Sequence, residues 1–292
     1  MRKNSMTRAR LALGLLGVAS IFGCSIAGQT SKGTLERIKT SGTFNMGYRE
    51  VAPPFSFPGP ERRPVGYSVD LCTHVASAIQ KQLGVILKLN WVPVTAANRV
   101  DMVAQGKVDI ECGTTTASLS RQERVDFSLM TFVDGGGLLT KSSLSFRTAT
   151  DLADKRIAVI PGTTTEPALT KFFKERFVTI RMVRVKNHLE GRSAVEIGLA
   201  EAFASDRAIL IGLLVTAKDP SSFRIPAMQF SYEPYAFMVR RDDATFRLMV
   251  NRALAELYRS GGIGEIYDRW FGSLGEPSPA LQAMYLLNGL PE

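Results

Sequence analysis

The sequence predicts an α/β protein made of two βα lobes that are joined by two crossover strands. Predicted strands alternate with predicted helices from about Gly33 onward, and the same order begins again near residue 156. Two extended segments, 135–140 and 235–240, suit the crossovers. Such alternation requires sheets whose faces are covered by helices. We therefore expect lobe 1 at 34–137 plus 236–275, lobe 2 at 140–232 and a C-terminal tail at 276–292.

Hydrophobic periodicity predicts three strands and two helices in the first part of lobe 1. The strands are expected at 43–48, 85–94 and 108–111, and the helices at 69–83 and 98–105, ending at Gly84 and Gly106. Prolines crowd the segment 48–66, which predicts a rigid, irregular loop. Phe55 and Phe57 in this loop either face a ligand as an aromatic wall or anchor the loop itself.

The second half of the chain repeats the same order of elements. Strands are expected at 156–160, 179–185 and 200–205, and helices at 165–176 and 191–199, followed by the segment 207–215. A helix at 245–259 is expected to return to lobe 1, with Tyr267, Trp270 and Phe271 as core residues. The segment 281–290 is either an added docking helix or a disordered tail.

The amino terminus has the pattern of an export signal, covering residues 1–27. A basic start precedes an apolar stretch at 11–22, which is shorter than the roughly 20 residues needed to span a bilayer. Two cleavage hypotheses stay open: a lipoprotein signal ending before Cys24, which would carry a lipid, or an ordinary site after Ser25-Ile26-Ala27. We expect a periplasmic protein that is either soluble or tethered by one lipid.

Composition excludes several classes of function. The chain has 292 residues, of which 45% are hydrophobic and 22% charged, as is usual for globular proteins. The net charge of +9 falls to +5 beyond the first ten residues, which weakens a nucleic-acid role. Two histidines and three cysteines without close ligand spacing predict no metal site and no haem or iron–sulfur cofactor. Cys72 and Cys112 either pair in the oxidising compartment or stay as buried thiols.

Two hydroxyl-rich segments lie between a predicted strand and a predicted helix. In 113–123, Ser120 and Glu123 have capping-box spacing, which would place Arg121 in the first turn of a helix. In 160–167, Thr163 and Glu166 have the same spacing. Helix starts, threonine hydroxyls and an arginine fork together suit a carboxylate. Ordinary helix capping with an exposed arginine is the alternative interpretation. The chain has no P-loop motif.

Six segments of the chain, taken in order, resemble family 3 solute-binding proteins: 43–50, 66–71, 98–100, 109–116, 162–166 and 267–271. Within that family they are most similar to the glutamate/aspartate-binding components of amino-acid ABC importers. The resemblance covers roughly 34–272. It implies the two-domain, type II periplasmic binding protein fold, an amino-acid ligand, a membrane permease as partner, no cofactor and a monomer. Closure would follow hinge motion near Thr140 and Tyr235.

The resemblance also implies roles for individual residues. Arg121 would clamp the ligand α-carboxylate, helped by Thr114, Thr116, Thr163 and Thr164, and Asp206 would pair with the α-ammonium. Arg49 and Arg99 would receive a side-chain carboxylate, and His188 would add a contact from lobe 2. A dicarboxylic amino acid carries two anions and one cation, so a dry site needs about two cationic groups and one anionic group.

Three positions depart from the family pattern, and two further functions remain open. Ala96 replaces a serine, Arg207 an acidic residue and Leu199 a basic one, which makes the ligand less certain than the family. The main alternative is an enzyme similar to periplasmic cyclohexadienyl dehydratases, with Glu166 or His188 as general acid. A sensor that acts through a separate partner is the third hypothesis.

Overall fold

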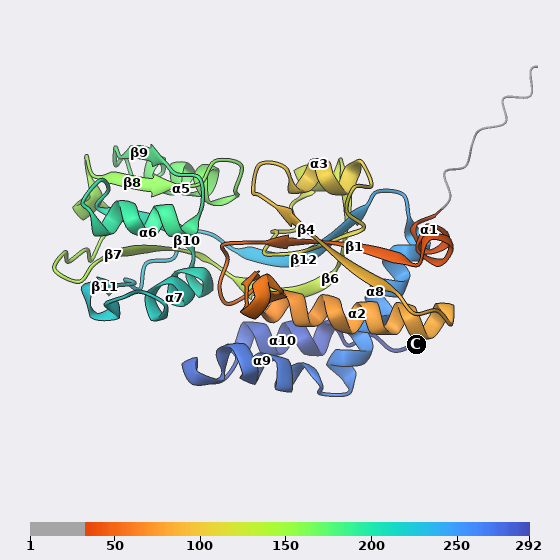
Figure 1. Ribbon diagram of the computed structural model, residues 1–292. Helices are drawn as coiled ribbons and strands as arrows, with labels where there is room; N and C mark the ends of the chain where they lie inside the picture. The colour runs from red at the N-terminus through yellow and green to blue at the C-terminus, as the bar shows by residue number, and fades with distance from the viewer. Residues whose placement is uncertain (1–32) are drawn as a thin grey trace, which may run out of the picture. The chain divides into compact units, whose positions relative to one another are not determined.

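The computed structural model describes residues 33–292, which form two five-stranded sheets with helices and a small hairpin (Figure 1). The predicted export signal, its cleavage sites and Cys24 lie outside the described residues. Within 33–292, the helices are too short or too polar to cross a membrane. The predicted α/β class is confirmed.

The first sheet, with its helices, is called lobe 1. Its strand order is β4-β1-β5-β12-β6; β1 is parallel to β4 and β5, whereas β12 is antiparallel to β5 and β6. The strands are β1 (Thr43–Arg49), β4 (Lys88–Val94), β5 (Ile110–Cys112), β6 (Val125–Asp134) and β12 (Glu233–Arg240). The helices are α1 (Thr34–Ser41), α2 (Tyr67–Leu83), α3 (Arg99–Ala104), α4 (Leu119–Gln122), α8 (Ala244–Arg259), α9 (Ile263–Phe271) and α10 (Pro279–Asn288).

Apolar side chains fill both faces of the first sheet. On one face, Phe44 and Met46 of β1 pack in a single core with residues of α2, α8, α9 and α10. On the other face, Val103 of α3 packs with Val94 and Met238. Figure 1 shows α2 and α3 on opposite sides of these strands. Burial of apolar surface on both faces therefore fixes the strand ends that carry the candidate site.

The second sheet, with its helices, is called lobe 2. Its order is β11-β7-β10-β8-β9; β7 is antiparallel to β10 and β11, and β8 is parallel to β10 and β9. The strands are β7 (Gly136–Lys141), β8 (Arg156–Val159), β9 (Arg181–Arg184), β10 (Ala202–Asp206) and β11 (Phe223–Arg224). The helices are α5 (Thr165–Lys174), α6 (His188–Glu196) and α7 (Arg207–Val215), with 3-10 turns η2 (Ala149–Leu152) and η3 (Pro220–Ser222).

Strand β10 shows how the faces of lobe 2 are divided. Phe203 packs in one core with residues of α6 and α7, whereas Ala202 and Ala204 belong to a second core with Leu169 and Phe173 of α5. Side chains alternate between faces along a strand, so β10 is covered on both sides. Its last residue, Asp206, is thereby held at the carboxyl end of the sheet.

The chain passes between the sheets twice. It leaves lobe 1 between β6, which ends at Asp134, and β7, which begins at Gly136; it returns between β11 and β12, which begins at Glu233. Asp134 and Glu233 are paired in the antiparallel register of β6 and β12. The two passages therefore lie side by side, as a hinge of two strands requires.

Several predicted boundaries differ from the structure by a few residues. Strand β4 begins three residues later than expected, and α6 begins at His188 rather than at residue 191. Asn187 caps α6 by accepting a hydrogen bond from the Glu190 amide, which starts the helix earlier than its apolar pattern suggests. The proline-rich loop is irregular, as predicted, but contains β2 (Phe57–Pro58) paired with β3 (Pro64–Val65) and the 3-10 turn η1 (Pro60–Arg62).

Of the two interpretations left open for Phe55, the structure supports anchoring of the loop. This side chain is fully buried and has edge contacts with Tyr67, Phe132, Tyr235 and Phe271. Large aromatic surfaces gain most from burial among one another, so the ring anchors the loop in lobe 1. Phe57 packs against Trp270 in the same way.

The segment after Pro277 folds as a helix on lobe 1 rather than as a disordered tail. Tyr285 of α10 shares a hydrogen bond between hydroxyl groups with Tyr67 at 2.9 Å, and the Asn288 side chain accepts from the Met130 amide at 3.2 Å. Ser278 caps the helix, and the short 3-10 turn η4 (Gly272–Leu274) connects α9 to this region. Helix α10 thus covers part of the lobe 1 core.

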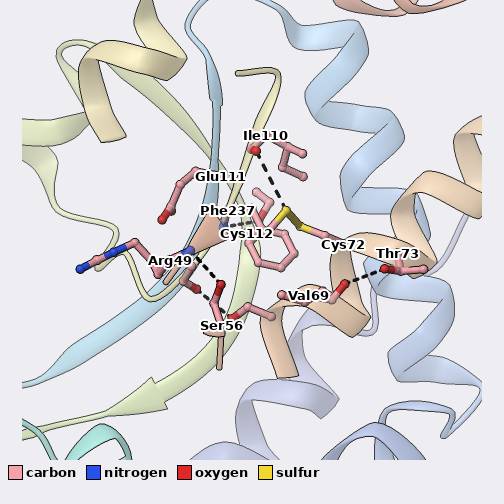
Figure 2. Close-up of a disulfide and its surroundings, with 12 residues drawn as sticks. Arg49, Ser56, Val69, Cys72, Thr73, Ile110, Glu111, Cys112 and Phe237 are labelled. Atoms are coloured by element: carbon pink, nitrogen blue, oxygen red, sulfur yellow. Dashed lines mark hydrogen bonds between the residues drawn. A yellow bond between two sulfur atoms is a disulfide. The ribbon is translucent and has the colours of Figure 1, made fainter. Parts of the chain in front are cut away.

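A disulfide between Cys72 and Cys112 ties α2 to β5 (Figure 2). Its Cα atoms are 6.0 Å apart, and both residues are fully buried. Cys112 lies between Glu111 and Gly113, and Figure 2 shows the bond close to Arg49 and Glu111. The disulfide therefore anchors the strand that leads into the threonine-rich segment 114–116.

Breaking this disulfide should lower the free energy of unfolding by about 4 kcal/mol, because it closes a loop between cysteines 40 positions apart. Urea unfolding of the wild type with and without reductant measures the effect, and a double variant, Cys72→Ser with Cys112→Ser, should match the reduced wild type. A reduced protein with an unchanged unfolding midpoint would contradict this prediction.

Gly212 provides a second test, because α7 of lobe 2 contacts the proline-rich loop of lobe 1 at this residue. A Cβ atom on Gly212 would lie 2.4 Å from the Pro53 carbonyl oxygen, a contact that only backbone movement can relieve. Gly212→Ala should lower the free energy of unfolding by about 1–3 kcal/mol through overpacking. Gly264→Ala in α9, where a Cβ would meet nothing within 4 Å, is the control. Equal stability of the two variants in urea would refute the contact.

Candidate functional site

The two lobes contact each other through polar groups at the ends of their strands. Arg121 of lobe 1 donates from Nη2 to the Gly162 carbonyl of lobe 2 at 3.4 Å, and the Thr116 and Thr164 hydroxyls are 3.2 Å apart. His188 of lobe 2 bonds through Nδ1 to the Val51 carbonyl of lobe 1. The structure therefore brings both hydroxyl-rich segments together with His188, as one site requires.

Three arginines are the main cationic groups of this region. Arg49, at the end of β1, and Arg99, at the start of α3, are buried, and Arg121 of α4 is half-buried. Within residues 33–292, none of the three forms an ion pair with a carboxylate within 4.0 Å. Burial lowers the pKa of Arg49 and of Arg121 to about 10, with a further contribution from the Arg99 charge. Arg49 and Arg121 therefore remain cations at neutral pH, and a cationic region of this kind favours anions.

Backbone carbonyls hold two of these arginines in place. Arg121 donates from Nη1 to the Thr116 carbonyl at 2.8 Å, and Arg99 donates from Nη1 to the Thr114 carbonyl at 3.4 Å. Bonds to neutral carbonyls orient a guanidinium group without neutralising its charge. The Nε atom of Arg99 is buried without a partner. Both side chains are therefore oriented and still able to bind a carboxylate.

Asp206, the last residue of β10, is the buried acid of lobe 2. Its Oδ2 accepts a hydrogen bond from the Tyr235 hydroxyl, whereas Oδ1 is buried without a partner in the described chain. Burial, followed by the nearby charges of Glu233 and Asp134, raises the pKa of Asp206 to about 8, although the Tyr235 hydrogen bond and the Arg99 charge act in the opposite direction. Such a carboxyl ionises readily only when a cation arrives.

The hydroxyls of Thr116 and Thr164 are directed to a protein carboxylate. Both donate to Oε2 of Glu233, at 2.5 Å and 2.6 Å. Because each hydroxyl carries one proton, these two groups can offer only lone pairs to a further partner. Thr114 is buried with no hydroxyl bond to the described chain, and the Thr163 hydroxyl donates to the Ile160 carbonyl at 2.7 Å within its own turn.

His188 is a neutral acceptor at this site. Burial and the Arg49 charge lower the pKa of His188 to about 3. Since the Val51 carbonyl can only accept, Nδ1 carries the proton and Nε2 presents a lone pair. The imidazole therefore suits a hydrogen-bond donor such as an ammonium group.

Both predicted capping boxes are wrong. The N-cap of α4 is Ser118, which accepts from the Arg121 amide at 3.3 Å, and α4 has only four residues. The chain just before α4 is held in place by the Ala117 amide, which donates to the Pro234 carbonyl of β12. Helix α5 begins after Thr164, which makes no side-chain cap, while Glu166 pairs with Arg184. Tertiary pairing thus overrides both local patterns.

Four further polar residues of the site were not among the predicted ligand contacts: Glu111, Asp134, Glu233 and Tyr235. Glu111 accepts from the Thr115 hydroxyl at 2.8 Å, while its Oε1 is buried without a partner. A Cβ on Gly113 would lie 2.1 Å from this Oε1, so the glycine allows the carboxylate to lie against the backbone. For Glu111, the signal in the sequence is an acidic residue within a strand that is otherwise apolar, because carboxylates are rarely buried without a specific role.

The described residues contain no group of three or more histidine, cysteine or acidic side chains that could hold a metal. The polar groups that the structure brings together at the site are the arginines, Asp206, hydroxyls and backbone carbonyls. This donor set can bind an organic molecule that carries both carboxylate and ammonium groups.

The sequence matches a known protein family and several of its members. Residues 44–273 match the family described as bacterial extracellular solute-binding proteins, family 3. The chain is 37% identical over 267 residues to the L-glutamate/L-aspartate-binding protein of Pseudomonas aeruginosa, covering 90% of this chain and 88% of that protein. It is 33% identical over 272 residues to the glutamate/aspartate import solute-binding protein of Escherichia coli, covering 93% and 89%.

Solved structures show the same fold. A P235GK mutant of the T. maritima protein ArgBP matches with a TM-score of 0.71 and 28% identity, over 82% of this chain and 99% of that one. An ancestral amino acid-binding protein, described as a precursor of cyclohexadienyl dehydratase, matches with a TM-score of 0.71, 27% identity and the same coverage. The fold is the type II periplasmic binding protein fold. The chain belongs to family 3 of the bacterial extracellular solute-binding proteins.

Proposed function

We propose that this protein is the extracytoplasmic binding component of an amino-acid ABC importer and that its ligand is glutamate or aspartate. The observation that carries the proposal is the gathering of Arg49, Arg99 and Arg121 near Asp206. Within residues 33–292, no carboxylate lies within ion-pair distance of the three arginines, and one Asp206 oxygen is buried without a partner. Relatives named for glutamate and aspartate binding support the choice of ligand.

The ligand charges can be assigned to these groups. Arg121 takes the α-carboxylate, because its guanidinium is held between carbonyls of both lobes. Asp206 takes the α-ammonium, and Arg49 and Arg99 take the side-chain carboxylate. Both ligand carboxylates are then paired with arginines, and the ligand ammonium is paired with an aspartate. No ligand charge stays unpaired when the ligand is buried.

The α-ammonium can also use the acceptors that the structure supplies. The Thr116 and Thr164 hydroxyls both donate to Glu233, so each can still accept a hydrogen bond through its lone pairs. Nε2 of His188 is an acceptor in the same region. This assignment differs from the expected help of Thr116 and Thr164 to the α-carboxylate, because a hydroxyl donates only once.

All three departures from the family pattern can be placed in the structure. Arg207 donates to the Pro226 carbonyl at 2.8 Å within lobe 2, and its charge acts on Asp134. Leu199 is half-exposed. Ala96 is buried, and its carbonyl lies 3.6 Å from the position of a Cβ on Gly162, where the lobes meet.

Binding between two lobes gives a transport signal by closure. The ligand gains partners from both lobes only when they are together, so its binding energy shifts the open and closed populations. The paired passages at Asp134 and Glu233 are the hinge. We propose a membrane permease as the partner that receives the closed form, a periplasmic monomer, and Cys24 as the lipid site if the first cleavage applies.

The dehydratase alternative has less support. Glu166 is ion-paired with Arg184 at 3.2 Å, and the lowered pKa of His188 leaves it without an acidic proton on the free nitrogen. A general acid needs a pKa near the working pH and a proton within reach of the substrate. The ancestral dehydratase precursor among the neighbours is itself described as an amino acid-binding protein.

Arginine substitutions separate the two ligand carboxylates. Arg121→Ala should weaken binding of glutamate and glutamine alike by at least about 100-fold, because both share the α-carboxylate. Arg99→Ala should weaken glutamate by a similar factor but change glutamine far less. Isothermal titration measures both, and Arg184→Ala, whose side chain is exposed and paired with Glu166, is the control. Equal losses for both ligands in Arg99→Ala would contradict the assignment.

The raised pKa of Asp206 predicts a pH dependence of binding. Below pH 8 the free carboxyl is protonated, and an ammonium ligand must displace that proton. Glutamate affinity should therefore rise about tenfold per pH unit from pH 6 toward pH 8, with release of one proton. Titrations in buffers of different ionisation enthalpy measure this release.

Asp206→Asn is the matched control for this dependence. Asp134, whose pKa is raised to about 6 by burial, also titrates in this range, and the variant separates the two groups. The variant should bind weakly and lose the slope between pH 7 and pH 8. Proton uptake by the wild type, or an unchanged slope in the variant, would refute the role of Asp206.

A further inference from the structure

Glu233 is a buried acid at the point where the chain returns to lobe 1. It is the first residue of β12, and only 1% of its surface is exposed. In the strand register it lies opposite Asp134, so two carboxyl groups face each other across the hinge. Like charges in directly opposed positions destabilise a sheet. Partners for each carboxylate must therefore offset this cost.

The partners of Glu233 come from both lobes. Its Oε2 accepts from Thr116 of lobe 1 at 2.5 Å and from Thr164 of lobe 2 at 2.6 Å. Its Oε1 accepts from the Ser231 hydroxyl at 2.7 Å. Asp134 uses different partners, the amides of Gly135 and Ala208. One oxygen of Glu233 is thus the shared acceptor for two hydroxyls that belong to different lobes.

This arrangement has two physical consequences. First, protein groups alone form the bridge between the lobes, so it requires no ligand. Second, both hydroxyl protons are fixed on Oε2, which directs the remaining lone pairs of Thr116 and Thr164 away from Glu233. The two donor–acceptor distances of 2.5 Å and 2.6 Å are at the short end of the range for hydroxyl donors, so the orientation is well defined.

We propose that Glu233 is a positioning residue that joins the two lobes and orients the hydroxyls of Thr116 and Thr164 as acceptors for the ligand. It touches no ligand group itself. Its bridging role is independent of the ligand, whereas its orienting role rests on the proposed binding of an amino acid. The two roles are therefore tested by different measurements.

The bridging role is tested without ligand, on the chain lacking residues 1–27. Spin labels on cysteines introduced at two exposed positions, Gln82 of α2 and Lys174 of α5, report the distance between the lobes. Glu233→Ala should raise the ratio of separated to joined lobes about tenfold, as expected for the loss of one charge-assisted hydrogen bond. Glu233→Gln should give a ratio between those of the wild type and Glu233→Ala, because the amide oxygen of glutamine still accepts hydrogen bonds. Distances in Glu233→Ala that match the wild type would overturn the bridge.

Asp243→Asn is the matched control for loss of a buried carboxylate. Asp243 caps α8 and accepts from the Phe246 and Thr34 amides, within lobe 1. This variant should be less stable, yet its distance distribution should equal that of the wild type. If it separates the lobes as much as Glu233→Ala does, the effect is general destabilisation and the bridge is refuted.

The orienting role is tested by ligand selectivity. Glutarate has both carboxylates of glutamate but no ammonium group, so it cannot use the threonine acceptors. Glu233→Ala should weaken glutamate at least about tenfold more than glutarate, and adding Thr116→Val should cause little further loss. Equal weakening of both ligands would overturn this role. A wild type that binds neither compound would refute the proposed ligand, while the distance measurement still decides the bridge.

Discussion

Three arginine guanidinium groups that no carboxylate of the described chain approaches within ion-pair distance impose the strongest constraint on this structure. Removing a charge from water is costly unless the charge is paired. Backbone carbonyls of Thr114, Thr116 and Gly162 orient two of these groups but leave their charge intact. In the proposed function, an anionic ligand supplies the missing partners. The rest of the site is arranged around this excess of positive charge, including Asp206, whose carboxyl group has a raised pKa.

The scaffold explains how such groups are held together. Arg49 and Asp206 end strands whose faces are covered by helices, so their positions follow from the packing of buried apolar side chains on those faces. The disulfide at Cys112 fixes the strand before the threonine segment. The hinge strands carry Glu233, which connects that segment to lobe 2. The same few strand ends therefore carry both the contacts between the lobes and the proposed binding groups.

Much of the fold could be predicted from the sequence, because strand and helix periodicities are local properties. The two lobes, the crossovers and the candidate arginines with Asp206 were accessible in this way or through the family resemblance. The helix caps were not, since the Ala117 amide pairs with Pro234, which is more than a hundred residues away. Nor could the sequence choose between ligand contact and burial for Phe55. Glu233 was missed because its partners come from two distant segments.

The most direct test of the central claim is titration of the wild-type protein, freed of bound ligand, with glutamate and glutamine. The two compounds differ by one side-chain charge. If the buried arginines bind the side-chain carboxylate, glutamate should bind at least about 100-fold more tightly than glutamine. Glutamine has no charge at this position and would leave a buried cation unpaired. Equal affinities, or tighter binding of glutamine, would contradict the account while leaving the family and fold in place.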